Sequence, residues 1–109
     1  MISISNLKKY FELENGIETD LSFRNIYIGD VLSLAISQLK EDSLWLTMQN
    51  NINVCAVAVL REVKVILITS GIKPDNNLLT KSIQENIPIY TTNLDHFQAI
   101  KLLIKNEDL

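Results

Sequence analysis

Short polar segments follow the hydrophobic runs of this sequence, and their side chains offer hydrogen-bond donors and acceptors suited to ligand binding. One of them, Thr69-Ser70-Gly71, ends the aliphatic run 65–68 abruptly. In open parallel sheets, ligands bind outside the carboxyl ends of the strands, where helix N-termini favour anions. The segments therefore predict a neutral crevice, and Lys73 is the only positive charge near it in the sequence. The candidate ligand-binding residues are Gln49, Asn50, Thr69, Ser70, Gly71, Lys73, Thr91 and Thr92.

The same residue types also have a purely structural interpretation. Asp, Asn, Ser and Thr are the preferred N-caps of helices, so a chain that alternates strands and helices carries them at these positions in any case. For any one turn the capping interpretation is favoured, and the recurrence of the pattern strengthens the crevice hypothesis without replacing it. At the turn after residue 68, Gly71 is expected to supply a positive φ angle.

Proton-transfer chemistry has one candidate pair, His96 beside Asp95. No serine or cysteine nucleophile is linked to this pair by a motif, so an ordinary surface or half-buried histidine is the favoured interpretation. An enzyme of phosphoryl or acyl transfer that uses His96 and Asp95 stays an alternative. The segment TSGIKPDNN has one glycine and no Gly-Lys-Ser/Thr step, which excludes a P-loop. One histidine and one distant cysteine do not make a structural zinc site, and neither a metal nor a cofactor is predicted.

Alternating segments of regular structure must position these residues. Hydrophobic patterning predicts strands over 25–28, 43–48, 64–68 and 88–91, and helices over 3–12, 30–38, 52–62, 75–86 and 93–105. Asp30 and Asp75 are expected to cap two of these helices. Continuous aliphatic strands that alternate with helices are typical of a parallel sheet. The expected fold is a single α/β domain over residues 1–109, in two or three layers, with helices packed on a mainly parallel sheet of four to five strands.

The expected helix over 52–62 has no polar face, since its sequence reads INVCAVAVLRE. A helix that is apolar all round must be buried all round, and a chain of 109 residues has little material to cover the side away from the sheet. A dimer interface is therefore favoured over burial beneath the terminal helices of the same chain. The candidate interface residues are Ile52, Val54, Val57, Ala58 and Leu60.

Composition excludes several classes of function. The net charge is −3 and the lysines and arginines are spread along the chain, which argues against nucleic acid as a partner. The single cysteine forms no intrachain disulfide and fits a reducing cytoplasm. The first residues, MISISNLKKYFE, lack the apolar core of a signal peptide, and the longest apolar run is too short to cross a membrane.

Four segments, in this order and spacing, resemble the DRTGG domain family over about residues 20–105: NIYIGDVLS, DSLWLTMQNNINVCAVAVLRE, VILITSGIKPDNNLL and NIPIYTTNLDHFQAIKLL. The family includes free-standing proteins of this length, domains inserted between CBS domains in family II inorganic pyrophosphatases, and domains attached to phosphotransacetylases. It is also similar to the N-terminal domain of HPr kinase/phosphorylase. The resemblance implies an α/β domain that is not itself catalytic, associates as a dimer and serves regulation.

The sequence departs from the family pattern at two candidate positions. Many relatives have an Asp-Arg pair where this chain has Asn50-Asn51, and Thr-Gly-Gly where it has Thr69-Ser70-Gly71. No binding residue of the family is therefore carried over. The expected partners are a second copy of the chain, a nucleotide or small phosphorylated metabolite, and, from the context of free-standing relatives, a protein of a kinase- or hydrogenase-related operon. The leading hypothesis is a dimeric ligand-sensing regulatory module, and a structural interaction domain without a ligand is a further alternative.

Overall fold

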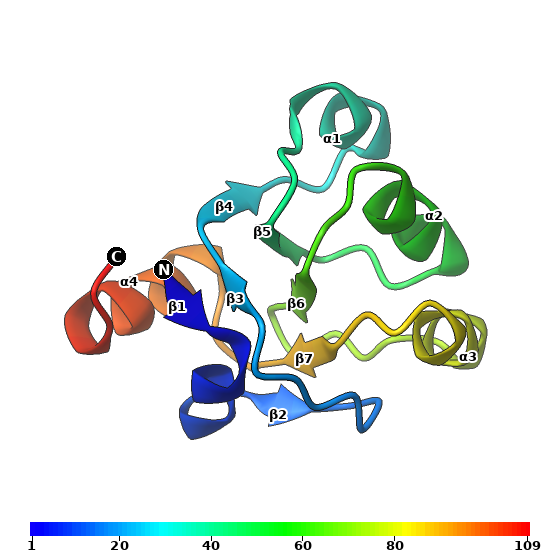
Figure 1. The fold of residues 1–109 in the computed structure, drawn as a ribbon. Coiled ribbons are helices and arrows are strands. Elements are labelled where there is room, and N and C mark those ends of the chain that lie inside the picture. Colours follow the sequence, from blue (N-terminus) through cyan, green and yellow to red (C-terminus); the bar gives the residue numbers. More distant parts are fainter.

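Four aliphatic strands lie parallel and side by side in the computed structural model, which describes residues 1–109 (Figure 1). They are β4 (Asn25–Ile28), β5 (Ser43–Thr47), β6 (Val65–Ile68) and β7 (Ile89–Thr91). A fifth strand, β2 (Glu12–Leu13), pairs antiparallel with β7, which gives the order β2-β7-β6-β5-β4. The prediction of a mainly parallel sheet of four to five strands is confirmed.

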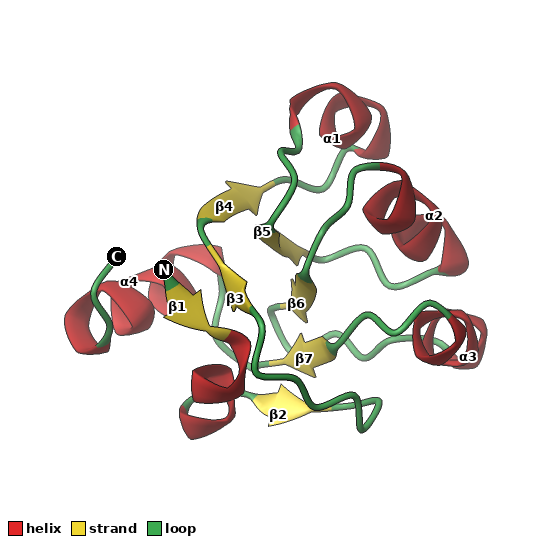
Figure 2. Ribbon diagram, viewed as in Figure 1, coloured by secondary structure: helices red, strands yellow, loops and turns green.

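Helices cover both faces of this sheet, as Figures 1 and 2 show. One face is covered by α1 (Leu32–Gln38), α2 (Ile52–Leu60) and α3 (Asn76–Gln84). The other is covered by α4 (His96–Asn106) and a 3-10 helix, η1 (Ile4–Lys9). Successive residues of a strand point to opposite faces, so β5 and β6 contribute side chains to a core on each face of the sheet. Both strands are buried along their whole length. The fold therefore has three layers.

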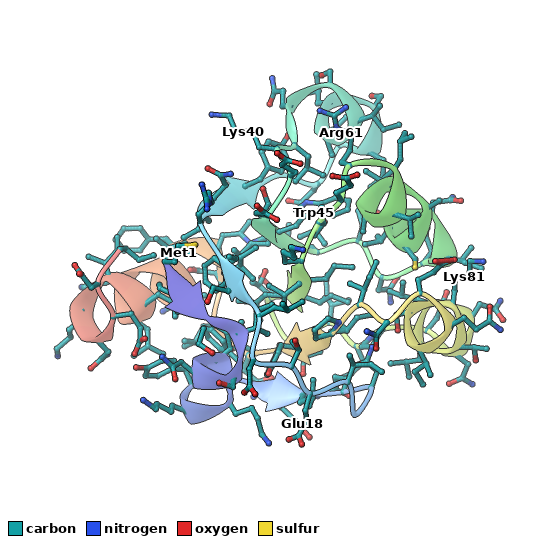
Figure 3. The ribbon with its side chains drawn as sticks, viewed as in Figure 1. Met1, Glu18, Lys40, Trp45, Arg61 and Lys81 are labelled. Carbon is teal, nitrogen blue, oxygen red and sulfur yellow. The ribbon has the colours of Figure 1, made fainter.

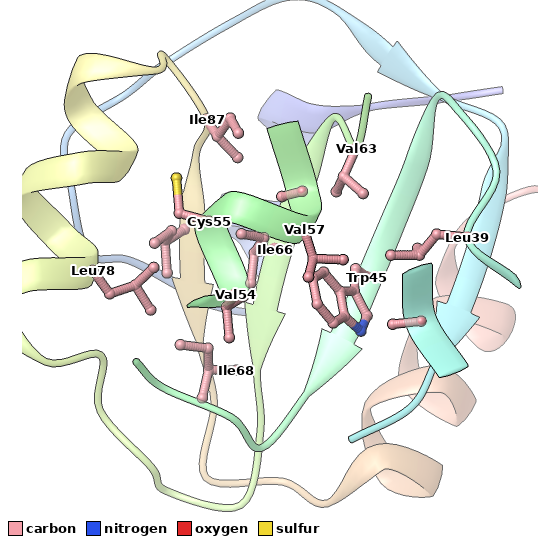
Figure 4. Close-up of a cluster of buried hydrophobic side chains, with 13 residues drawn as sticks. Leu39, Trp45, Val54, Cys55, Val57, Val63, Ile66, Ile68, Leu78 and Ile87 are labelled. Atoms are coloured by element: carbon pink, nitrogen blue, oxygen red, sulfur yellow. The ribbon is translucent and has the colours of Figure 1, made fainter. Parts of the chain in front are cut away.

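Trp45 lies at the centre of the core beneath α1, α2 and α3 (Figure 4). Its ring packs among aliphatic side chains that include Leu39 and Val57, and it has no exposed surface. Its indole Nε1 donates a hydrogen bond to the carbonyl oxygen of Gly29 at 3.0 Å, so the one polar atom of the ring is satisfied. Because Gly29 directly follows β4, this hydrogen bond holds the start of the loop between β4 and α1 against the buried ring.

The expected helix over 3–12 is wrong in type and extent. The structure has β1 (Ile2–Ser3), the short η1 and then β2, and β1 pairs antiparallel with β3 (Ser22–Phe23). Glu12 and Leu13 make ladder pairs with β7, and Phe11 is buried in the second core. Tertiary pairing and burial here override a local helical pattern.

Side chains cap three of the four α-helices. Asn51, Asp75 and Asp95 each accept a hydrogen bond from a backbone N–H in the first turn of α2, α3 and α4 respectively. The prediction for Asp75 is confirmed. Asp30 does not cap α1, which begins after Val31 without a side-chain cap, because the Asp30 carboxylate is bonded elsewhere. No helix of the chain combines the length and apolarity needed to cross a membrane.

Candidate functional site

A cavity of about 300 Å³ opens at the carboxyl ends of β6 and β7, where β2 adds to the sheet. Three stretches of chain that are far apart in the sequence form its walls. The lining residues are Tyr10, Phe11, Glu12, Gly71, Lys73, Thr91, Thr92, Asn93 and Leu94. Because polar side chains and loop backbone dominate this lining, the cavity suits a hydrogen-bonding ligand better than an apolar one.

Lys73 supplies the positive charge of the cavity, and two carboxylates already contact it. Its Nζ lies 3.2 Å from Oε2 of Glu14, 3.5 Å from Oε2 of Glu12 and 3.4 Å from Oγ1 of Thr91. The hydrogen bond to Glu14, more than any other contact, raises the pKa of Lys73 above its ordinary value. The carboxylates outnumber the ammonium, so the wall is not the neutral one that the sequence predicts.

The two carboxylates beside Lys73 differ in exposure and in their hydrogen bonds. Glu14 accepts a hydrogen bond from the Thr91 hydroxyl at 2.6 Å, and its side chain is only 17% exposed. Glu12 has a side chain that is 72% exposed and makes no second polar contact. An anionic ligand can therefore take the place of Glu12 beside Lys73 while Glu14 stays where it is.

Thr69 lies outside the cavity and is fully buried. Its Oγ1 is 2.9 Å from Nδ1 of His96, and Nε2 of the same histidine is 3.2 Å from Oδ2 of Asp30. A chain of hydrogen bonds therefore joins the ends of β4 and β6 to the start of α4. The sequence pairs His96 with Asp95, whereas the structure pairs it with Asp30 and uses Asp95 in a capping box with Gln98.

The Asp30 carboxylate is the hub of this hydrogen-bond chain. Its Oδ1 accepts from the backbone N–H of Met48 at 2.5 Å and from the Thr47 hydroxyl at 3.1 Å. Partial burial by itself would raise the pKa of Asp30, but the hydrogen bonds from Met48, His96 and Thr47 outweigh it and hold the pKa below its ordinary value. Asp30 therefore stays ionised and accepts from two segments at once, the end of β5 and the start of α4.

Asp30, His96 and Thr69 are the residue types of a hydrolase triad, but their arrangement does not suit nucleophilic attack. The Thr69 side chain has no exposed surface, and neither Thr69 nor His96 lines the cavity. A nucleophile needs space for a reacting atom about 3 Å away. No three histidine, cysteine or carboxylate side chains gather closely enough to hold a metal ion. The chain of hydrogen bonds acts as a structural tie.

The structure brings half of the predicted binding residues together, namely Gly71, Lys73, Thr91 and Thr92. Gln49 and Asn50 instead join loops, since their side-chain amides donate to the carbonyl oxygens of Asp30 and Lys73 at 2.9 and 2.8 Å. Ser70 is exposed beside the cavity, with a φ angle of 63°. Gly71 has a φ angle of 75°, which confirms the expected left-handed turn.

Sequence reasoning missed the remaining residues that line the cavity, which are Tyr10 to Glu12 and Asn93 and Leu94. The first of these stretches reaches the cavity only through the pairing of β2 with β7, which no local pattern indicates. The second directly follows Thr91 and Thr92, so adjacency to the candidate residues is the signal that could have found it.

Of the predicted interface residues on α2, some lie in the core of the chain and others on its surface. Val54, Val57 and Ala58 are buried in the core of their own chain, which corrects their assignment to a dimer contact. Ile52 and Leu60 are 44% and 64% exposed, and Val59, which the prediction omits, is exposed as well. The helix is apolar on both sides, but only its outer side is available to a partner.

Comparison with known proteins agrees with the resemblance seen in the sequence. A family model described as the DRTGG domain matches residues 13–105. No curated protein matches the chain. One solved structure, the CBS and DRTGG domains of the regulatory region of Clostridium perfringens pyrophosphatase complexed with the activator diadenosine tetraphosphate, superposes with a TM-score of 0.79 at 18% sequence identity. The match covers 94% of this chain and 46% of that one, and likeness at this identity shows the shared fold.

Proposed function

The chain belongs to the DRTGG domain family, and from this membership together with the cavity we propose that it is a non-catalytic regulatory module that senses a small ligand. The observation that carries the proposal is the polar cavity at the carboxyl ends of β6 and β7, which holds Lys73. Ligands of open α/β sheets bind at this position. The full burial of Thr69 speaks against the alternative of an enzyme that uses His96.

The proposed ligand is a nucleotide or a small phosphorylated metabolite. A phosphate oxygen beside Lys73 would replace Glu12, and the Thr92 hydroxyl and the backbone around Gly71 would add neutral hydrogen bonds. The fold match to a regulatory region that was crystallised with diadenosine tetraphosphate makes adenine nucleotides the first class to test. Because Lys73 is exposed, salt is expected to weaken its attraction for the phosphate.

We further propose that the module acts as a dimer through the outer surface of α1 and α2. Ile52, Val59 and Leu60 of α2 are exposed, and Leu34 and Ile36 are exposed on the neighbouring α1 (Figure 1). Exposed apolar side chains on two adjacent helices favour this surface as a site of interaction. Two copies related by a two-fold axis would each cover the patch of the other, since an isologous interface uses the same surface on both subunits.

A thermal-shift and calorimetric titration with ATP, ADP and diadenosine tetraphosphate tests the ligand proposal. A ligand that binds only the folded state raises its melting temperature, so at least one nucleotide should do so for the wild type. Lys73→Ala should weaken binding about tenfold or more, because it removes a charge-assisted hydrogen bond. Lys81→Ala is the matched control, since Lys81 lies on α3 outside the cavity lining and pairs with Glu85 (Figure 3). Absence of any shift, or equal losses in both variants, would contradict the proposal.

A further inference from the structure

The outer face of α4 carries large apolar side chains that nothing in the chain covers. Phe97 is 72% exposed and Ile104 is 61% exposed, and these residues are two helical turns apart. A shallow groove of about 260 Å³ runs beside them along the helix. Its lining residues are Leu94, Gln98, Lys101, Leu102 and Lys105.

The inner face of the same helix already satisfies its packing against the sheet. Ala99 and Leu103 are fully buried in the second core, so the apolar residues on the outer face are not needed to anchor α4. The Lys101 ammonium lies 5.9 Å from the centre of the Phe97 ring, within range of a cation–π contact. The outer face of α4 is therefore an apolar surface that includes a lysine, and it lies on the side of the sheet opposite α1, α2 and α3.

The charges within α4 are of one sign, and the carboxylate directly before the helix is its N-cap, Asp95, which accepts from the backbone N–H of Gln98. Within α4 the ionised side chains are Lys101 and Lys105, and the helix contains no carboxylate, although the protein as a whole has a net charge of −3. Glu107, the first carboxylate after the helix, does not pair with them, because it accepts from the Tyr10 hydroxyl at 2.5 Å and the Asn6 amide at 3.1 Å. The outer face of α4 is therefore basic and apolar, although the protein as a whole is acidic.

We propose that the outer face of α4 is a docking surface for an amphipathic helix of another protein, with carboxylates flanking its apolar stripe. Such a helix would lay its apolar residues against Phe97 and Ile104 and pair its carboxylates with Lys101 and Lys105. A two-fold contact between two α4 helices does not fit the face, because it would bring lysine against lysine with no carboxylate from either helix between them. This surface adjoins the ligand cavity at Leu94, which lines both, and shares no residue with the α1–α2 patch.

The probe is a labelled synthetic peptide of about 20 residues, long enough to be partly helical alone. It has leucine at helical spacing and glutamate on both flanks, and a second peptide replaces every glutamate by lysine. Fluorescence anisotropy gives the affinities, and amide chemical shifts locate the contact on the protein. The glutamate peptide should bind more tightly and shift the amides of Phe97, Lys101 and Ile104.

Three variants make the test specific. The double change Lys101→Glu and Lys105→Glu should weaken the glutamate peptide about tenfold or more and favour the lysine peptide, because it reverses the charge complementarity. Phe97→Ser should weaken both peptides, and its high exposure leaves folding intact. Ile83→Ser is the matched control, since it removes an exposed apolar side chain from α3 in the opposite layer and should change nothing.

Several outcomes would overturn the proposal. They are no binding of the glutamate peptide, equal affinity for both peptides, or chemical shifts confined to α1, α2 and α3. Binding to vesicles of phosphatidylglycerol and phosphatidylcholine without binding to the peptide would also overturn it, and would assign the face to an anionic lipid surface instead.

Discussion

Nε2 of His96 lies 3.2 Å from Oδ2 of Asp30, and this contact ties the first residue of α4 to the loop that follows β4. The other ring nitrogen of His96 bonds the buried hydroxyl of Thr69. One imidazole therefore joins the carboxyl ends of two strands to a helix on the far face of the sheet. The loop that precedes α4 carries Thr92 and Leu94 into the cavity, so this contact also fixes one cavity wall.

Asp30→Asn should destabilise the protein by about 1–3 kcal/mol at pH 7, the range for hydrogen bonds to a charged group. The pKa of Asp30 is lower in the folded protein than its ordinary value of 3.8. The carboxylate therefore contributes stability above that ordinary value, and the contribution is lost as the pH falls through the folded-state pKa. Urea unfolding from pH 7 down to acid should show the variant and the wild type converging. Asp108→Asn, in the exposed C-terminal tail, is the control, and a constant difference at every pH would refute the assignment.

Glu12→Gln should tighten nucleotide binding about two- to fivefold, because Glu12 competes with the phosphate for Lys73 across an exposed ion pair. Calorimetry with the best nucleotide measures the change. Glu41→Gln removes one negative charge at the opposite end of the strands and should leave the affinity unchanged. If both variants tighten binding equally, only the net charge of the protein matters and Glu12 has no specific role.

Leu60→Glu should convert the proposed dimer to a folded monomer. The side chain is 64% exposed in one chain, so the change alters stability by only about 0.5 kcal/mol, whereas it places two like charges across the proposed interface. Sedimentation over a range of concentrations measures the association. Ile104→Glu, on the other layer, should leave the dimer intact. A wild-type protein that stays monomeric at high concentration would rule out this interface.

Val57→Glu should unfold the protein, which is more than the loss of the proposed dimer contact. Val57 packs against Trp45 in the first core and is 5% exposed, so a carboxylate there would be buried without a partner (Figure 4). The expected loss exceeds about 3 kcal/mol. Circular dichroism and thermal melting distinguish this result from that of Leu60→Glu, and a folded Val57→Glu monomer would show that Val57 lies at an interface after all.

Local sequence patterns predicted the strands that are continuous aliphatic runs and the helix that begins with a typical cap residue. The strands over 43–48 and 64–68 and the capped helix after Asp75 are confirmed within a few residues, because aliphatic runs and cap residues signal them directly. The N-terminal segment was predicted wrongly as one helix. Its strand β2 is two residues long and depends on a partner that lies at the other end of the sequence.

The candidate site was predicted in part for the same reason. Lys73 and Thr91 follow strands, so the rule that ligands bind at strand ends placed them correctly at the cavity. Glu12 and Glu14 reach Lys73 across the β2–β7 pair, which sequence reasoning cannot place. Asp30 and His96 are separated by 66 positions, and no spacing rule links an aspartate before one helix to a histidine in another. The missing polar face of α2 predicted burial all round, whereas the structure buries Val54, Val57 and Ala58 and leaves Ile52 and Leu60 exposed.

The pairing of β2 with β7 has a consequence for synthesis on the ribosome. Glu14 leaves the exit tunnel early, yet its partner Thr91 follows 77 positions later. The parallel strands β4, β5 and β6 can associate in the order in which they emerge. In contrast, β2 pairs only with β7, so it stays unpaired until β7 has been made. The cavity therefore cannot form until the chain has been made as far as Leu94, and a ligand that binds there can act only on a nearly finished domain.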